Sequence, residues 1–396
     1  MALPYTGTQN SSLTQTPLIE TQEHNHTQLS KSLTRLETFL RIFGFCQYSA
    51  FSITVSWVVF LLLGIVLPVL SIHFSYCINC EKYQISIFEV EVLVFECLAA
   101  AISLLCISHN LRKYGVRKFL FVDRYHGHLS QFDDEYAKKI KEFFRLVVAW
   151  ALPFLLVKTA REVVRVLYVP HDSWWQAVAI PIALIVSWIY STVIFISGCA
   201  LFNLVCNLQV LHFENYGKLL ERDLDVSVYI EEHIRLTHHL SKISHRFRLF
   251  FIFELLTITA SQVVALFETT GNSGIITLIN GGDFVVSSVL ELVGLVICLH
   301  AAAKTSHRAQ SVASVATKWH SLVTCSSSDN SQAGSNHNGG EVDNPGLLRI
   351  NYSESDLESV DYIPMPTNAQ LTSYTFSYHK RQAFGMYLIS KFTEVS

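Results

Sequence analysis

Residues 177–206 read AVAIPIALIVSWIYSTVIFISGCALFNLVC, a stretch without a single charged side chain. An α-helix rises about 1.5 Å per residue, so roughly 20 apolar residues are enough to cross a hydrocarbon core of about 30 Å. Long uncharged runs of this kind are typical of helices that lie in lipid. The stretch therefore predicts a membrane-spanning helix.

Five further segments have the same character, and each holds roughly 20 or more mostly apolar residues. Half of the 396 residues are hydrophobic, only 15% are charged and the mean hydropathy is +0.33, whereas a soluble domain carries about 25% charged residues. We therefore predict an all-α fold, a polytopic membrane helix bundle with six transmembrane helices. The other five predicted spans are 48–72, 86–108, 146–169, 248–267 and 274–300.

The basic residues are distributed unevenly between the connections. Lys and Arg accumulate on the cytoplasmic side of membrane proteins. Here the connections at 73–85, 170–176 and 268–273 contain one basic residue in total, Lys82. The other basic residues are concentrated before the first span, in the second and fourth connections, and after the sixth span. Both termini are therefore expected in the cytosol, and the first 30 residues show no basic start and no apolar core of a signal peptide.

The chain divides by composition into four parts. Residues 1–34 are expected to form a disordered cytosolic tail, and residues 35–325 a transmembrane helix bundle with cytosolic anchor helices. Residues 326–366 are expected to form a disordered cytosolic loop, and residues 367–396 a C-terminal remnant whose short helix does not span the membrane.

Long helical extensions into the cytosol are predicted at 109–145 and 207–247. Apolar residues recur there at helical spacing, as at Tyr136, Ile140 and Phe143. The apolar stripes either pack against one another as a collar or lie on the membrane surface, and we favour packing because the polar faces mix Glu with Arg.

Ionisable residues within the predicted spans are the best candidates for a functional site. Each costs about 2.5–3.5 kcal/mol on insertion scales, so such residues mark interior or functional positions. A stripe at i, i+4 and i+7 runs along the third span, and we expect it to face acidic residues of the second span in the outer half of the membrane. The candidates for a polar pocket that binds a polar or anionic ligand are Glu96, Lys158, Arg161, Glu162, Asp283 and Glu291.

Two simpler interpretations of these charges remain open. The side chains pair structurally with one another, or long side chains near the span ends extend to the lipid headgroups. For Asp283, which follows Gly281 and Gly282 in NGGDF, the alternative to ligand binding is capping of a helix kink.

Cysteine and histidine patterns suggest no cofactor. Cys77 and Cys80 form a C-x-x-C in a predicted external loop, which is a candidate disulfide, half of a metal site, or two free thiols. His233 and the pair His238–His239 lack the spacing of three or four that places two ligands on one helix face, so these histidines are expected on the cytosolic surface. No metal, cofactor or nucleic acid is expected, and the chain is not predicted to be an enzyme.

Three long strings carry a resemblance to a known family: HHLSKISHRFRLFFIFELLTITASQVVALFETTG at 238–271, INGGDF at 279–284 and ICLHAAAKTSHRAQSVASVATKWHSLVTC at 297–325. They resemble the plant gustatory-receptor-like membrane proteins, which are regarded as distant relatives of insect gustatory and odorant receptors. The resemblance covers roughly residues 35–388. It implies seven helices, a cytosolic N-terminus, an outer-half ligand pocket, a cytosolic anchor region and assembly as a tetramer. It also implies a ligand-gated cation channel or chemoreceptor as the parent function.

The resemblance breaks off near the C-terminus. In the family, RQAFxMYL leads through a glycine-rich turn into a final apolar helix, whereas here RQAFGMYL at 381–388 is followed by ISKFTEVS. The resemblance therefore implies that the seventh, pore-lining helix is lacking and that this form does not conduct ions.

Sequence and resemblance together predict a receptor-like multi-pass protein of the plasma membrane, with an endomembrane as the alternative. Its expected partners are the lipid bilayer, an unknown small ligand and either further copies of itself in a tetramer or full-length family members. The alternative functions are a small-solute transporter that uses Glu96, Lys158 and Asp283 at mid-depth, or a non-conducting regulatory subunit.

Overall fold

The computed structural model describes residues 16–74, 87–120, 133–168, 174–220, 226–271 and 278–328, and every regular element in these ranges is a helix. Six helices are long and apolar enough to cross a membrane, which confirms the six predicted spans. They are Ala50–Phe74, Glu89–Phe119, Asp134–Leu167, Val178–Lys218, Arg235–Phe267 and Phe284–Ser311.

In chain order the helices are α1 (Thr16–Ile42), α2 (Ala50–Leu61), the π-helical turn η1 (Leu62–Val66), α3 (Leu67–Phe74), α4 (Ile87–Phe119), α5 (Asp133–Tyr168), α6 (Trp174–Leu220), α7 (Val226–Gly271) and α8 (Leu278–Ser328).

The first span consists of three consecutive elements, α2, η1 and α3. Pro68 is the second residue of α3 and has no backbone N–H to continue the α-helical pattern. A π-helical turn at this point lets α2 and α3 continue as one span.

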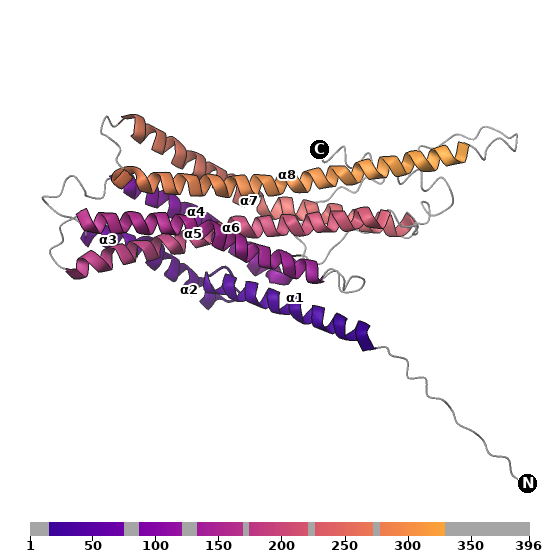
Figure 1. The fold of residues 1–396 in the computed structure, drawn as a ribbon, viewed down its shortest axis with the longest axis horizontal. Helices are drawn as coiled ribbons and strands as arrows, with labels where there is room; N and C mark the ends of the chain where they lie inside the picture. Colours follow the sequence, from indigo (N-terminus) through magenta and orange to yellow (C-terminus); the bar gives the residue numbers. More distant parts are fainter. Residues whose placement is uncertain are drawn as a thin grey trace, which may run out of the picture.

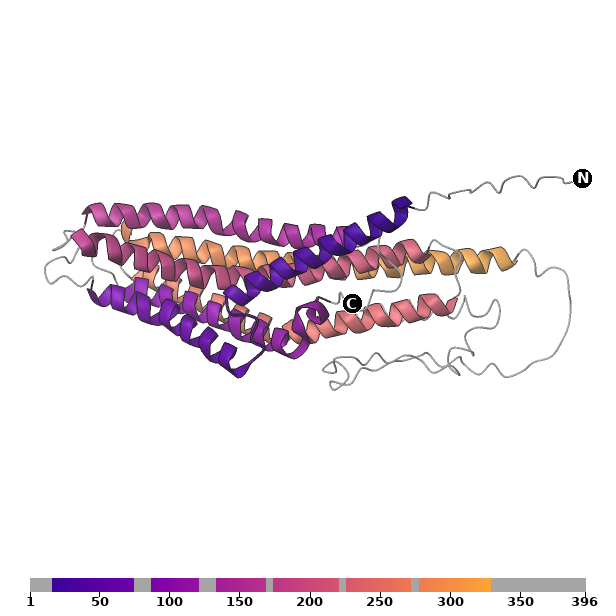
Figure 2. The same cartoon turned by 90° about the horizontal axis from the view of Figure 1, so that it is seen from below.

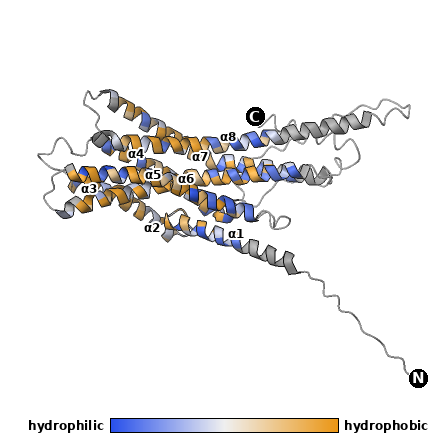
Figure 3. Cartoon of the chain, viewed as in Figure 1, coloured by the Kyte–Doolittle hydropathy of each residue, from blue (hydrophilic) through white to orange (hydrophobic). Residues whose placement is uncertain are grey.

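Several helices extend far beyond the thickness of a membrane. α6 has 47 residues and α8 has 51, lengths of roughly 70 Å or more against an apolar core of about 30 Å. Figure 1 shows α1, α6, α7 and α8 projecting beyond the other helices at one end of the bundle. In Figure 3 the orange, hydrophobic residues gather toward the opposite end. We call these ends the polar half and the apolar half; the predicted helical extensions form the polar half.

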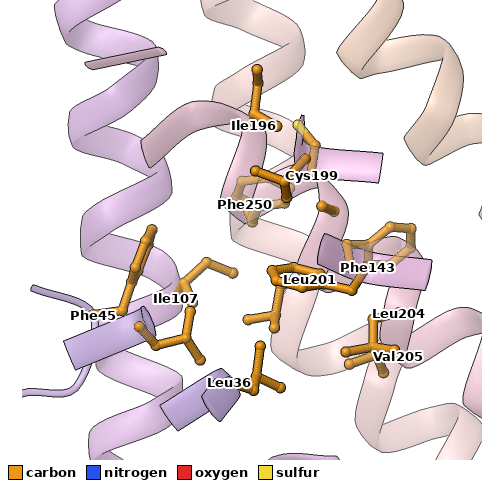
Figure 4. Close-up of a cluster of buried hydrophobic side chains, with 14 of the residues drawn as sticks. Leu36, Phe45, Ile107, Phe143, Ile196, Cys199, Leu201, Leu204, Val205 and Phe250 are labelled. Atoms are coloured by element: carbon orange, nitrogen blue, oxygen red, sulfur yellow. The ribbon is translucent and has the colours of Figure 1, made fainter. Parts of the chain in front are cut away.

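Helix α6 is the centre of the bundle. Ile194, Ile196 and Ala200 have no exposed surface, and α6 packs against α3, α4, α5 and α8. Both views of the fold show α6 and α8 side by side along their length (Figures 1 and 2). In Figure 4 the labelled side chains of α6 meet side chains of α4, α5 and α7 in one apolar cluster.

A glycine allows three of these helices to lie in close contact. A Cβ atom on Gly294 of α8 would lie 2.8 Å from Phe195 of α6 and 2.9 Å from Trp150 of α5. The ring planes of Trp150 and Phe195 are nearly perpendicular, with centroids 6.1 Å apart. Three helices therefore meet at Gly294 without room for a larger side chain.

The N-terminal part of the chain corrects one prediction. Residues 1–34 were expected to be disordered, but α1 begins at Thr16, and residues 1–15 lie outside the described ranges. Leucines recur at helical spacing along α1 and are buried, and Phe39 packs edge-on against the α5 rings of Phe143 and Phe144. Because this stripe has a partner on α5, it folds as a helix despite its polar neighbours. The leucines are Leu29, Leu33, Leu36 and Leu40.

The apolar stripes of the predicted extensions pack into the bundle. Phe119 of α4 contacts Phe247 of α7 with ring centroids 5.6 Å apart. Stripe residues of α5, α6 and α7 are also buried, so the stripes pack against neighbouring helices. At its other end α8 continues to Ser328, three residues beyond the predicted boundary at 325, while the rest of 326–366 and all of 367–396 lie outside the described part of the chain. The buried stripe residues are Tyr136, Ile140, Phe143, Phe213, Tyr216, Leu236, Ile243 and Phe247.

Candidate functional site

Five ionisable side chains form a charged network in the apolar half. Arg161 of α5 donates to Glu89 of α4 at 2.5 Å and to Glu162 at 3.0 Å. Arg165 lies 3.8 Å from Glu89 and 3.7 Å from Glu162, and the Lys158 ammonium lies 3.9 Å from Glu162. We call these five residues the charged network.

The order of residues in α5 places its charged side chains on the buried face of the helix. Lys158, Glu162 and Arg165 follow one another at helical spacing, and Leu156, Val163 and Leu167 point outward and are exposed. The side chains of Arg161 and Glu162 are only 5% and 2% exposed. Charges inside and apolar side chains outside are typical of a helix whose outer face contacts lipid.

The network is almost balanced in charge. Three cations and two carboxylates leave a net charge of +1. The contact of Lys158 with Glu162 is the longest of these five ion pairs, at 3.9 Å. Gly282 at the start of α8 lies against Arg161, where a Cβ atom would be 3.4 Å from Cδ. The network therefore joins α4 to α5 and touches α8.

Three other carboxylates of the spans, Glu96, Glu254 and Glu291, lie apart from the charged network, and we call them the carboxylate set. Glu96 of α4 accepts hydrogen bonds from Nε1 of Trp188 at 3.0 Å and from the hydroxyl of Ser287. Glu254 of α7 accepts one at 2.7 Å from Ser103. Glu291 of α8 is within electrostatic range of both other carboxylates.

This carboxylate set is incompletely satisfied. Among the described residues, one oxygen of Glu254 and both oxygens of Glu291 lack a hydrogen bond of normal geometry, although the hydroxyl of Ser261 faces Glu291. Both side chains are buried. A buried carboxylate without a partner is costly in an apolar environment, so these oxygens favour a proton, a cation or a polar ligand.

The structure brings together part of the predicted pocket. Lys158, Arg161 and Glu162 lie in one cluster, and Arg161 pairs across the bundle with Glu89, as expected for the second and third spans. Glu96 instead bonds to α6 and α8, and Glu291 belongs with it in the carboxylate set. The side chains of Asp283, Cys77 and Cys80 lie outside the described part of the structure, so their predicted roles stay predictions.

Glu89 and Arg165 lie near the ends of the second and third spans, yet their side chains are only 10% and 11% exposed and pair within the network, so they do not extend to the lipid headgroups. One contributor to the clusters was not predicted. Glu254 was not singled out at all. Its one sequence signal is that it is the only charge in the apolar run LFFIFELLTIT at 249–259.

Two of the three histidines predicted on the cytosolic surface are buried instead, and the side chain of the third, His233, lies outside the described part of the structure. His238 and His239 have no exposed surface, because α7 turns them into the packed part of the polar half. His212 of α6 is also buried and contacts the hydroxyl of Tyr136 on α5. Within the described ranges no group of three or more His, Cys, Asp or Glu is arranged to hold a metal ion.

Comparison with protein families identifies the family of this chain. A family model described as "Protein of unknown function (DUF3537)" matches residues 31–393, which is nearly the whole chain. The protein therefore belongs to this family. Neither the curated proteins nor the solved structures contain a match.

Proposed function

We propose that this member of the DUF3537 family is a receptor-like membrane protein that responds to a small polar or anionic ligand bound at the charged network. The observation that carries the proposal is a buried cluster of net charge +1 inside a membrane-spanning bundle. Ionisable residues at such positions mark ligand or ion pathways. The resemblance to gustatory-receptor-like proteins supports the same function, with a ligand-gated cation channel as the parent activity.

Lys158 is the residue through which an anionic ligand would act. Its ammonium contacts Glu162 at 3.9 Å, and Glu162 also accepts from Arg161 at 3.0 Å, so a ligand carboxylate at Lys158 would act on both contacts. Release of Glu162 from Lys158 changes the pairing of Arg161, which contacts α4 and lies against α8. Binding would then alter the packing of three helices, which is the physical requirement for a response.

The proposal includes an orientation and an assembly. The distribution of Lys and Arg supports a cytosolic polar half, both termini in the cytosol and the charged network in the outer half of the plasma membrane. The resemblance supports a homotetramer or a complex with other family members. A fluorescent protein that matures only in the cytosol, fused to the N-terminus, tests the orientation; absence of fluorescence in an expressed fusion would reverse it.

Ligand binding is tested with the purified full chain. A panel of small organic acids, amino acids and sugars is screened for an increase in melting temperature, with Lys158→Gln as the test variant and Lys218→Gln, an exposed lysine of the polar half, as the control. We expect an acid to stabilise the wild type and the control but not Lys158→Gln. Equal stabilisation of Lys158→Gln would reject the site, and a panel without any stabilising acid would count against an anionic ligand.

One observation favours a small-solute transporter as the second candidate. The unpartnered oxygens of Glu254 and Glu291 resemble the intramembrane carboxylates that carry protons in pumps and transporters. Proteoliposomes with a proton gradient and the same panel of solutes test this function. Uptake by the wild type that is lost in Glu291→Gln would support transport, whereas uptake that is unchanged in Glu291→Gln would exclude this carboxylate from the mechanism.

A further inference from the structure

A cavity of about 360 Å³ lies between α5 and α6, and no residue of the charged network lines it. Its polar wall is formed by Lys139, Glu142 and Arg145 of α5 and by Asn203 and Asn207 of α6. Its apolar wall includes Leu146, Ala149 and Leu204. Binding sites for small ligands typically measure about 300–1,000 Å³, so this cavity is large enough for a polar headgroup.

The cavity lies where the bundle changes from charged to apolar. Up to Arg145, α5 exposes charged residues such as Lys138 and Lys141, whereas Val148 and Leu152 beyond it are exposed and apolar. Figure 3 shows this change of hydropathy along the helices. A boundary of this kind marks the depth of the lipid headgroups, so the opening of the cavity faces phospholipid.

The polar wall carries a surplus of positive charge. Glu142 accepts from Lys139 at 2.8 Å, which holds that ammonium in place. Lys304 of α8 donates to Asn207 at 3.0 Å and adds a third cation at the rim. Lys139, Arg145 and Lys304 against one carboxylate give a net charge of +2.

Arg145 is the cation most available to a ligand. It is exposed and forms no ion pair within 4.0 Å in the part of the chain that the structure describes. A guanidinium binds phosphate oxygens through two parallel hydrogen bonds, and the amide groups of Asn203 and Asn207 supply further polar contacts. Basic pockets between transmembrane helices bind the headgroups of anionic lipids for these reasons.

We propose that this interfacial cavity binds an anionic phospholipid with a phosphomonoester headgroup. Arg145 and Lys139 contact the phosphate, and Lys304 adds attraction from the rim. The acyl chains follow the exposed apolar surface of α5 at Val148 and Leu152. A phosphomonoester carries a charge of about −1.5 to −2 near pH 7, which matches the surplus of the wall. The site is independent of the charged network.

The experiment uses the purified full chain in detergent and native mass spectrometry to count bound ligand. The probes are dioctanoyl phosphatidic acid, dioctanoyl phosphatidylcholine and inorganic phosphate. We expect one phosphatidic acid to be retained. The dissociation constants of phosphatidylcholine, which lacks the net negative charge, and of inorganic phosphate, which lacks the acyl chains, should each be at least about tenfold higher. Equal affinity for phosphatidylcholine would overturn charge recognition, and equal affinity for inorganic phosphate would overturn a lipid as the source of the phosphate.

Variants locate the lipid in this cavity. Arg145→Gln and Lys139→Gln should each weaken phosphatidic acid binding about fivefold, and the double variant about 25-fold. Lys141→Gln is the matched control, because Lys141 is an exposed cation of the same helical turns that does not line the cavity. Ala149→Trp keeps every charge but fills the space beside the apolar wall, so it should abolish retention of phosphatidic acid. Unchanged binding in the double variant and in Ala149→Trp would overturn the location.

Discussion

The ion pair between Arg161 and Glu89 allows a quantitative test of the charged network. Removal of one partner of a buried ion pair leaves an uncompensated charge and costs about 3–5 kcal/mol of folding free energy. The 2.5 Å distance and side-chain exposures of 5% and 10% place this pair in that class. We therefore expect Arg161→Gln and Glu89→Gln each to lower the free energy of unfolding several times more than a substitution in an exposed ion pair does.

The two substitutions should not be equally costly. The wild-type network has a net charge of +1, Arg161→Gln makes it neutral and Glu89→Gln raises it to +2. In addition, Arg165 lies 3.8 Å from Glu89 and can take over part of the role of Arg161. We expect Arg161→Gln near the low end of the range, about 3 kcal/mol, and Glu89→Gln above it. The double variant restores +1 and should cost less than the sum by about 0.5–3 kcal/mol.

The assay is reversible unfolding in mixed micelles, titrated with sodium dodecyl sulfate and followed by circular dichroism. Arg41 and Glu37 form the matched control, since they are 3.6 Å apart but 67% and 40% exposed. Substitutions in such a surface pair cost about 1 kcal/mol or less. Additivity of the two network substitutions within about 0.5 kcal/mol would refute the reasoning, as would a larger cost for Arg161→Gln than for Glu89→Gln.

Four further predictions concern packing and reactivity. Gly294→Ala should destabilise the fold by about 1–3 kcal/mol in the same unfolding assay, because its Cβ would lie 2.8 Å from Phe195. Gly217→Ala, where a Cβ meets nothing within 4 Å, should instead stabilise α6 by up to about 1 kcal/mol, and a destabilised Gly217→Ala would contradict this account of the two glycines. Gly44→Ala should cost about 1–3 kcal/mol in that assay, since Gly44 has a φ of +80° and its Cβ would overlap the Ser56 hydroxyl. An unchanged midpoint would show that the turn relaxes. Burial raises the pKa of the Cys46 thiol to about 11, so at pH 8 only about one thiol in a thousand is ionised and peptide mapping after maleimide treatment should find Cys46 unmodified until the protein is denatured.

Span number could be predicted from the sequence because it depends on local composition alone. Residues 177–206 need no partner to identify them as a span, since their length and lack of charge decide it. The helix α1 could not be recognised in the same way. Leu33 and Leu36 are separated by polar residues, and burial of this stripe is favourable only because α1 packs against α5.

The contact between the charged faces of the second and third spans could be predicted from the sequence, but the neighbours of Glu96 could not. The spacing of Lys158, Glu162 and Arg165 fixes their common face from the sequence alone. How far α4 and α8 are rotated about their own axes is decided by side-chain packing across the bundle. For this reason Glu96 was expected near Lys158, whereas it bonds to Trp188 and Ser287.

The two buried clusters differ in a way that separates the proposed functions. In the charged network every carboxylate has a cation within 4.0 Å, so the network is stable as a structural unit when no ligand is bound. In the carboxylate set, Glu254 and Glu291 have oxygens without a hydrogen bond among the described residues. An ionised carboxylate in the apolar half costs about 2.5–3.5 kcal/mol, so a fold that only needed stability would gain from replacing Glu291 with glutamine. A more stable Glu291→Gln protein that still binds its ligand at Lys158 would therefore assign the response to the network. A loss of transport in the same variant would assign function to the carboxylates.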